Sequence, residues 1–254
     1  MPESNSKRIL IIACEVFHRE ISALAARSPK VVDFVFLPKG LHDLETAKMR
    51  ARIQEEIDKA DSEKYEFVVL AYGLCNNGTL GLAAREAPLV IPRAHDCITL
   101  FFGSRSKYRE YFDSNPGTYY YTTGWTERGK TDLADNIMSQ LGLSSTYNEY
   151  VEKYGKDNAD YIMKVLGGWR ENYKKLTYIK MPVDGLPDYT ELSKAEAETH
   201  KWQFEVVDGD TAILNALATG DWESDEFVVV RAGETLSGAT GDEIFSAGLK
   251  DAKR

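Results

Sequence analysis

The sequence predicts an α/β protein with a mostly parallel sheet and helices on both faces. Short, continuously apolar runs alternate with longer amphipathic runs along most of the chain. Uninterrupted apolar runs are typical of strands that are buried on both faces, as in parallel sheets. The chain has 254 residues, shows no internal repeat and has no evident linker. We therefore expect one α/β domain over residues 1–254, either undivided or bilobed.

The expected elements follow one another in order. Strands are expected in the apolar runs 7–14, 31–38, 65–73, 87–96, 117–125, 176–182, 202–210 and 226–234. Helical spacing is seen at 15–29, 44–61, 97–116, 188–200 and 211–220. A tyrosine-rich helical stretch around 127–174 reads as an insertion that divides the strands into two groups. The Gly/Ser-rich tail, 235–254, is expected to be loosely ordered.

Composition excludes several classes of function. The formal net charge of −9 argues against a nucleic-acid surface, which needs a basic face. No apolar stretch approaches the roughly 20 residues needed to cross a membrane, so we expect no membrane partner. The apolar run near the N-terminus is followed by charged residues and not by a signal-peptide cleavage site, which predicts a cytoplasmic protein. Three cysteines in such a compartment are not expected to form structural disulfides.

The three cysteines share one position in the predicted fold. Cys14 ends the first expected strand, Cys75 follows the third, and Cys97 follows the fourth. Open α/β sheets bind ligands at the carboxyl edge of their strands, so these residues would converge if the strands are neighbours. The alternative is that all three are inert core residues, since free cysteine packs as a small hydrophobe.

Polar residues accompany the cysteines. His95 is the histidine best placed as a fourth ligand or as an acid/base group, with Arg93 and Asp96 as further catalytic candidates. Asp96 can equally cap the helix that begins at Cys97. His18 and His42 also lie near strand ends, and their roles stay open. The candidate substrate-binding residues are Arg19, the loop residues Asn76, Asn77 and Gly78, and Trp125 at the end of another strand.

These residue types point to a soft metal. Thiolate and imidazole are the ligands that zinc prefers, and a catalytic zinc keeps three protein ligands and one open position. Cys14, Cys75 and Cys97 match that count, with His95 as a fourth donor. The same three cysteines could hold a [4Fe–4S] cluster with one open iron. Asp208 and Asp210, before a helix, read most simply as a turn and cap.

Several blocks resemble the "domain of unknown function 1638" family. They are "ACEVFHREI", "LAYGLCNNG", "PRAHDCITLFFGS" followed by "YREYF", "GTYYYTTGW", and "WQFEVVDGD" with "FVVVRAGE", and they span most of the chain in that order. The family has no assigned chemistry. The resemblance implies company with corrinoid-dependent methyltransferase systems, and hence a corrinoid protein as a candidate partner beside a small-molecule substrate.

The resulting hypothesis is a zinc-thiolate enzyme of one-carbon metabolism, a methyltransferase component acting with a corrinoid protein. Bound zinc lowers the pKa of a substrate thiol and makes it a nucleophile for a methyl group. In that case Arg93 and Arg19 would hold an anionic part of the substrate. Two alternatives stay open. One is a lyase or desulfurase with the open-iron cluster, and the other is a non-enzymatic metal-binding or docking module that uses the 127–174 stretch.

Overall fold

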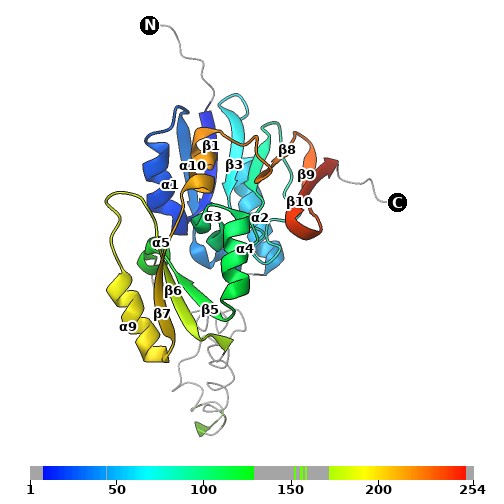
Figure 1. The fold of residues 1–254 in the computed structure, drawn as a ribbon. Helices are drawn as coiled ribbons and strands as arrows, with labels where there is room; N and C mark the ends of the chain where they lie inside the picture. The colour runs from blue at the N-terminus through cyan, green and yellow to red at the C-terminus, as the bar shows by residue number, and fades with distance from the viewer. Residues whose placement is uncertain are drawn as a thin grey trace.

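In the computed structural model, two sheets carry the fold (Figure 1). The structure describes residues 8–43, 45–128, 152, 155–156, 158 and 172–249. Nearly all of the predicted insertion at 127–174 therefore lies outside the described residues. Within them the protein is α/β and its sheets are mostly parallel, as predicted.

The larger sheet has five strands in the order β2-β1-β3-β4-β8. Its strands are β1 (Arg8–Cys14), β2 (Val32–Leu37), β3 (Tyr65–Ala71), β4 (Leu89–Pro92) and β8 (Phe227–Val230). The first four run parallel, whereas β8 is antiparallel to β4. Because β8 runs backwards, its first residues lie at the carboxyl edge of the parallel strands, where Phe227 pairs with Pro92.

Helices cover both faces of this sheet. The chain passes from β1 to β2 through the short η1 (Glu15–Phe17) and α1 (His18–Ala25), and returns to β3 through η2 (Lys39–Asp43) and α2 (Thr46–Asp58). Right-handed crossovers in opposite directions place α1 and α2 on opposite faces. α10 (Ala212–Thr219) packs beside α1 and also contacts β3 (Figure 1).

The smaller sheet contains three parallel strands in the order β5-β6-β7. They are β5 (Thr118–Tyr121), β6 (Lys175–Lys180) and β7 (Gln203–Asp208), with α9 (Thr190–His200) connecting the last two. The strands are divided differently from our expectation. The insertion interrupts the chain between β5 and β6, which belong to one sheet, and β8 returns to the larger sheet.

Short elements join the two sheets. After β4 come α3 (Cys97–Phe102) and α4 (Arg105–Ser114), and α5 (Thr123–Glu127) follows β5. One apolar core runs through both sheets, since Ile179 and Met181 bury with the residues of β1, β3 and β4. The predicted helix at 97–116 is two helices, because Gly103 adopts a left-handed φ of 69° that ends α3.

The C-terminal segment corrects the prediction of a loosely ordered tail at 235–254. Residues 234–249 form an antiparallel hairpin of β9 (Glu234–Gly238) and β10 (Phe245–Leu249), with η4 (Gly241–Glu243) in the turn. Leu236, Ile244 and Phe245 are buried in the main core. These three apolar side chains anchor the segment despite its many glycines and serines. Residues 250–254 lie outside the described part of the chain.

Candidate functional site

The three cysteines lie at one edge of the larger sheet. Cys14 is the last residue of β1, Cys75 lies in the loop after β3, and Cys97 begins α3 after β4. These three strands are consecutive neighbours, as the prediction required. The carboxyl edge of the sheet therefore carries all three thiols on adjoining segments.

The loop that carries Cys75 has an unusual backbone. Cys75, Asn76 and Asn77 are consecutive residues with positive φ values of 44°, 55° and 61°. Left-handed backbone is uncommon for non-glycine residues and persists only where the surroundings impose it. Strain of this kind tends to occur at functional sites, where it fixes a side chain in a required position.

Close contacts hold this loop against the segment that leads to Cys97. The amides of Leu74 and Cys75 donate to the carbonyls of Ala94 and His95, at 2.7 and 3.0 Å. Gly73 lies so close to this segment that a Cβ would come within 2.7 Å of the Asp96 amide nitrogen. The backbone therefore brings the Cys75 and Cys97 segments together without any contribution from their side chains.

The thiols influence one another electrostatically. Burial raises the pKa of Cys14 to about 12, and its neighbour Glu15 adds to the rise. The pKa of Cys75 is also raised to about 12, first by burial and then by the nearby Cys14. Cys97 has a pKa raised well above its usual value by burial, Asp96, Cys75 and Cys14, in that order. Each thiol is thus neutral near pH 7 and a poor nucleophile by itself.

Tyr72 adds an unsatisfied polar group at the same edge. It directly follows β3, it is 3% exposed, and its hydroxyl has no hydrogen-bond partner among the described residues. Burial raises the pKa of Tyr72 well above the usual value, and the charges of Cys14 and Cys75 in their ionised forms raise it further. A buried hydroxyl without a partner is costly, so this atom is a natural contact for a bound ligand.

Lys39 and its neighbours surround Cys14. The Lys39 amide donates to Glu15 Oε1 at 2.9 Å, and its buried ammonium donates to the Trp125 carbonyl at 3.1 Å. The ammonium also lies 4.8 Å from the centre of the Trp125 ring. Arg128 Nη1 lies 3.7 Å from Glu15 Oε2. Lys39 and Arg128 both oppose the rise in the Cys14 pKa.

Sequence reasoning missed Tyr72, Lys39 and Arg128. A tyrosine at the end of an apolar run reads as part of the core, and lysine and arginine in connecting segments read as surface residues. The only signal was position, since Tyr72 and Lys39 both follow strands at the carboxyl edge. Trp125 was predicted near the site, and its carbonyl and ring do contact Lys39.

Asp96 caps α3, in agreement with one of its two predicted roles. Its Oδ1 accepts from the Thr99 amide at 3.2 Å, and its Oδ2 accepts from the Tyr108 hydroxyl at 3.0 Å. Burial raises the pKa of Asp96, although the bonds from Thr99 and Tyr108 oppose the rise. Because Asp96 also raises the pKa values of Cys75 and Cys97, it is close to both thiols.

Other predicted residues take different positions. Arg19 is exposed and paired with Glu127, with Nε 2.6 Å from Oε1, and His18 is exposed and packs on the Phe36 ring. His95 is exposed, as are Asn76 and Asn77, whereas Gly78 is buried against Met49. Arg93 donates through Nη1 to the carbonyls of the C-terminal hairpin. The side chain of His42 lies outside the described part.

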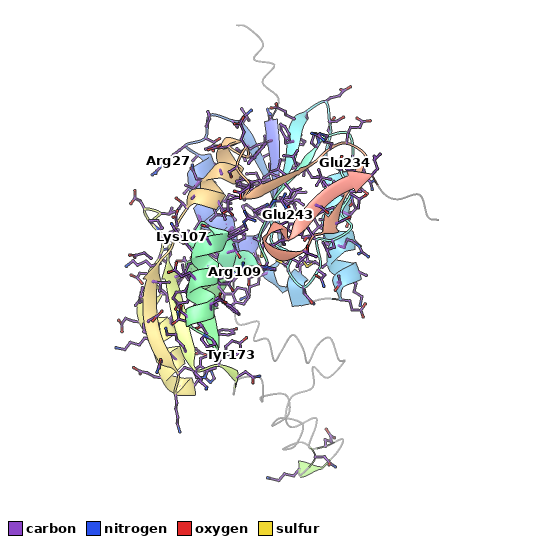
Figure 2. All side chains as sticks on the ribbon, turned by 45° about the vertical axis from the view of Figure 1, so that its right-hand side comes forward. Arg27, Lys107, Arg109, Tyr173, Glu234 and Glu243 are labelled. Atoms are coloured by element: carbon purple, nitrogen blue, oxygen red, sulfur yellow. The ribbon has the colours of Figure 1, made fainter. Side chains whose placement is uncertain are left out.

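A cavity of about 810 Å³ adjoins this edge. Arg93, His95, Asp96 and Thr99 form one wall, α4 forms another, and the segments before β8 and β10 complete it. Figure 2 labels Arg109 on α4 and Glu243 on the hairpin, and both line this cavity. Asp96 belongs both to the cavity wall and to the surroundings of the thiols.

The predicted metal donors do not form a coordination group in the described part of the chain. Within the described residues, no group of three or more His, Cys, Asp or Glu side chains is arranged to hold a metal ion. In the same part of the chain, no helix is long and apolar enough to span a bilayer. The fold and site thus define a class: an α/β protein with one buried thiol, two half-buried thiols and a cavity at one sheet edge.

A comparison with family models assigns the chain more closely. The model described as "Protein of unknown function (DUF1638)" matches residues 36–218, well over half of the chain. The chain belongs to this family, and the resemblance seen in the sequence blocks is confirmed. Cys75 and Cys97 lie inside the matched range, and Cys14 precedes it. No curated protein and no solved structure matches the chain.

Proposed function

We propose that Cys14, Cys75 and Cys97 hold a catalytic metal centre at the carboxyl edge of the larger sheet. The observation that carries this proposal is the convergence of one buried and two half-buried thiols from three separate segments. Cys14 raises the pKa values of Cys75 and Cys97, and Cys75 also raises that of Cys97. Such thiols have little use as nucleophiles or redox groups while they stay protonated. A bound cation reverses this, because a coordinating thiol loses its proton outright.

Two features support the fit of the donor set. Thiolates are preferred ligands for zinc and for iron–sulfur clusters. The unpartnered hydroxyl of Tyr72 lies near Cys14 and Cys75, where a ligand on an open metal position would meet it. The loop at Cys75–Asn77 has a strained backbone, and such strain is typical of positions where a side chain is fixed for a function.

The two candidate metal centres need different spacings between their sulfur ligands. A single tetrahedral zinc has Zn–S distances of about 2.3 Å, which requires its sulfur ligands to lie within ~4 Å of one another. The described residues contain no such group of three donors. A [4Fe–4S] cluster binds each cysteine to a different iron and so spreads the sulfurs farther apart. The cluster is therefore kept as the second candidate, with lyase or desulfurase chemistry at its open iron.

The zinc form leads to methyl transfer. In that reaction a substrate thiol would give up its proton to His95, two residues before Cys97. Its sulfur would form a bond to the methyl carbon as the cobalt–carbon bond of a methylated corrinoid breaks. The electron pair of that bond would stay on cobalt. The corrinoid partner follows from the family resemblance, and the three thiols would supply the ligands that hold the zinc.

Metal analysis of protein purified without oxygen tests the proposal. One zinc per chain in colourless protein would favour methyl transfer, whereas four irons with four sulfides and a brown colour would favour the cluster. Cys14→Ser, Cys75→Ser and Cys97→Ser should each lose stoichiometric metal. Cys→Ser variants that keep the metal, or a wild-type protein that binds none under either preparation, would overturn the proposal.

A further inference from the structure

The cavity beside the thiols has the size and lining of a small-molecule site. Its volume of about 810 Å³ falls within the range of known ligand pockets. It reaches the protein surface at Phe112, which is 52% exposed, and extends inward to Asp96. Tyr108, Phe112 and Ile244 give it an apolar portion, and arginines and carboxylates give it charged groups of both signs.

Several charged groups of the cavity are already occupied, and the carboxylates of Asp113 and Glu243 also line it. Arg105 is paired with Glu226 through Nε at 3.1 Å and with Asp225 through Nη2 at 3.1 Å. Asp96 accepts bonds from Tyr108 and Thr99, and burial favours its neutral form. Arg105 and Asp96 shape the wall, but their charges are compensated within the protein.

Arg93 is different because only carbonyl oxygens hold it. Its Nη1 donates to the carbonyls of Glu243 and Phe245, and its own amide donates to the Glu226 carbonyl at 2.7 Å. These bonds fix the guanidinium in place without neutralising it. Among the described residues no carboxylate forms an ion pair with Arg93. Its remaining N–H groups are therefore prepared for a planar anion.

We infer that this cavity binds the substrate of the thiol centre, and that the substrate is a small anionic molecule with an apolar body. Arg93 holds the anionic group, a carboxylate or a phosphate. The apolar body lies along Tyr108 and Phe112 of α4. The reacting end then faces Asp96, which lies close to Cys75 and Cys97. This inference rests on the proposed function, since it assigns the cavity to the same centre.

Anion titration tests this assignment. Isothermal titration calorimetry measures the affinity in every variant, and NMR of arginine side-chain Nε–H signals locates the bound anion in proteins that keep Arg93. Malonate and inorganic phosphate are the probes and distinguish carboxylate from phosphate chemistry. Wild-type protein should show a saturable shift of the Arg93 signal with one of them. In Arg93→Lys, which keeps the charge but loses the planar fork, binding should weaken about tenfold or more. Arg8→Gln is the matched control, because Arg8 lies at the amino end of β1 and pairs with Asp33.

The outcomes separate this inference from the proposed function. A saturable shift in metal-free Cys97→Ser, together with wild-type protein that binds no metal, would support the anion site and overturn the metal centre. Metal-loaded wild-type protein with no saturable shift from either anion would overturn the cavity assignment alone. Equal binding by wild type and Arg93→Lys would likewise overturn it. If Arg93→Lys binds more weakly, a folded NMR spectrum of the variant excludes loss of the hairpin as the cause of the weaker binding.

Discussion

The carboxyl edges of the two sheets treat their polar residues in opposite ways. At the three-stranded sheet, Asp210 pairs with Lys107 and accepts from the Ala212 amide at 2.9 Å, so that it forms the predicted turn, whereas the N-cap position of α10 is Thr211. Asp188 likewise pairs with Lys180, at 2.9 Å. At the five-stranded sheet, one buried thiol and two half-buried thiols lie on adjoining segments, and the Tyr72 hydroxyl has no partner among the described residues.

This difference is the basis on which we propose a ligand at the five-stranded edge. Polar groups that are hydrogen-bonded or paired with neighbouring residues are accounted for by the fold and need no ligand. Groups that are buried, strained or unpaired reduce stability, and they persist where something outside the protein chain completes them. The comparison therefore favours the five-stranded edge, and it can be tested by perturbing matched residues in the two regions.

The largest effect is expected at the joint between the regions. Gly124 in α5 lies against η1, where a Cβ would come within 1.8 Å of the Val16 carbonyl oxygen. Helix propensity alone predicts that Gly124→Ala would stabilise α5 by up to ~1 kcal/mol. We expect the contact to dominate and the free energy of unfolding to fall by more than about 4 kcal/mol. Urea denaturation, or loss of soluble folded protein, measures this.

Gly248→Ala is the control for that substitution. Gly248 lies in β10, and a Cβ there would meet no atom within 4 Å. Its free energy of unfolding should stay within about 0.5 kcal/mol of wild type. If Gly124→Ala behaved like this control, α5 would not be held against η1, and Trp125 and Lys39 would lose their place beside Cys14.

Two buried or half-buried glutamates should respond to pH in opposite directions. Glu20 in α1 is fully buried with neither carboxylate oxygen partnered in the described residues, and burial raises its pKa from 4.5 to about 7. Glu205 on β7 pairs with Lys175 at 2.7 Å. Burial opposes ionisation of Glu205, but the bonds from Lys175 and Tyr111 lower its pKa.

The signs follow from proton linkage. Between pH 4.5 and about 7 the unfolded chain releases the Glu20 proton while the folded chain keeps it, so stability falls as pH rises. Glu20→Gln removes this loss, which is at most about 3 kcal/mol at pH 8 and absent at pH 4. Glu205 contributes stability above pH 4.5 that is lost as pH falls, so Glu205→Gln should lose up to ~1 kcal/mol at pH 7.

Urea denaturation at pH 4, 6 and 8 distinguishes these cases. The Glu20→Gln curve should be flatter than wild type between pH 4 and 8, and the Glu205→Gln difference should shrink at pH 4. A Glu20→Gln variant that is less stable than wild type at pH 8 would show that the Glu20 carboxylate has a partner. The two regions would then not differ in the way described above.

The sequence predicts the sheet edge well because strand position depends on apolar periodicity. The runs that end at Cys14 and precede Cys75 and Cys97 are strongly apolar, so the order of residues along the edge could be anticipated. The pairing of β5 with β6 could not be predicted, because it depends on contacts between residues far apart in the sequence. The helix break at Gly103 also looked like helix interior, since its neighbours keep helical spacing.

Side-chain roles were harder to predict than positions. Arg93 was expected to hold an anionic part of the substrate, but the sequence did not indicate that carbonyls 150 and 152 positions later along the chain hold its guanidinium. Tyr72 looked like core, and only its unpartnered hydroxyl distinguishes it from other buried tyrosines. Hydrogen-bond partners come from the whole fold, so local sequence carries little information about which polar groups stay unsatisfied.

The smallest effect should come from two buried tyrosines, one in each region. Tyr178 in β6 is 1% exposed, and its hydroxyl lies 3.0 Å from Thr123 Oγ1 and accepts from the Tyr189 amide at 3.3 Å. Tyr178→Phe leaves these partners unpaired and should lower the free energy of unfolding by about 1 kcal/mol. Tyr72→Phe removes a hydroxyl that has no partner in the described structure.

Metal-free Tyr72→Phe should therefore be as stable as metal-free wild type, or more stable by up to ~1 kcal/mol. Urea denaturation in the presence of a chelator measures the free energies of unfolding of both variants and of wild type. If Tyr72→Phe lost as much stability as Tyr178→Phe, the Tyr72 hydroxyl would have a partner within the protein. It would then give no reason to place a ligand beside Cys14 and Cys75, and the two sheet edges would differ only in their thiols.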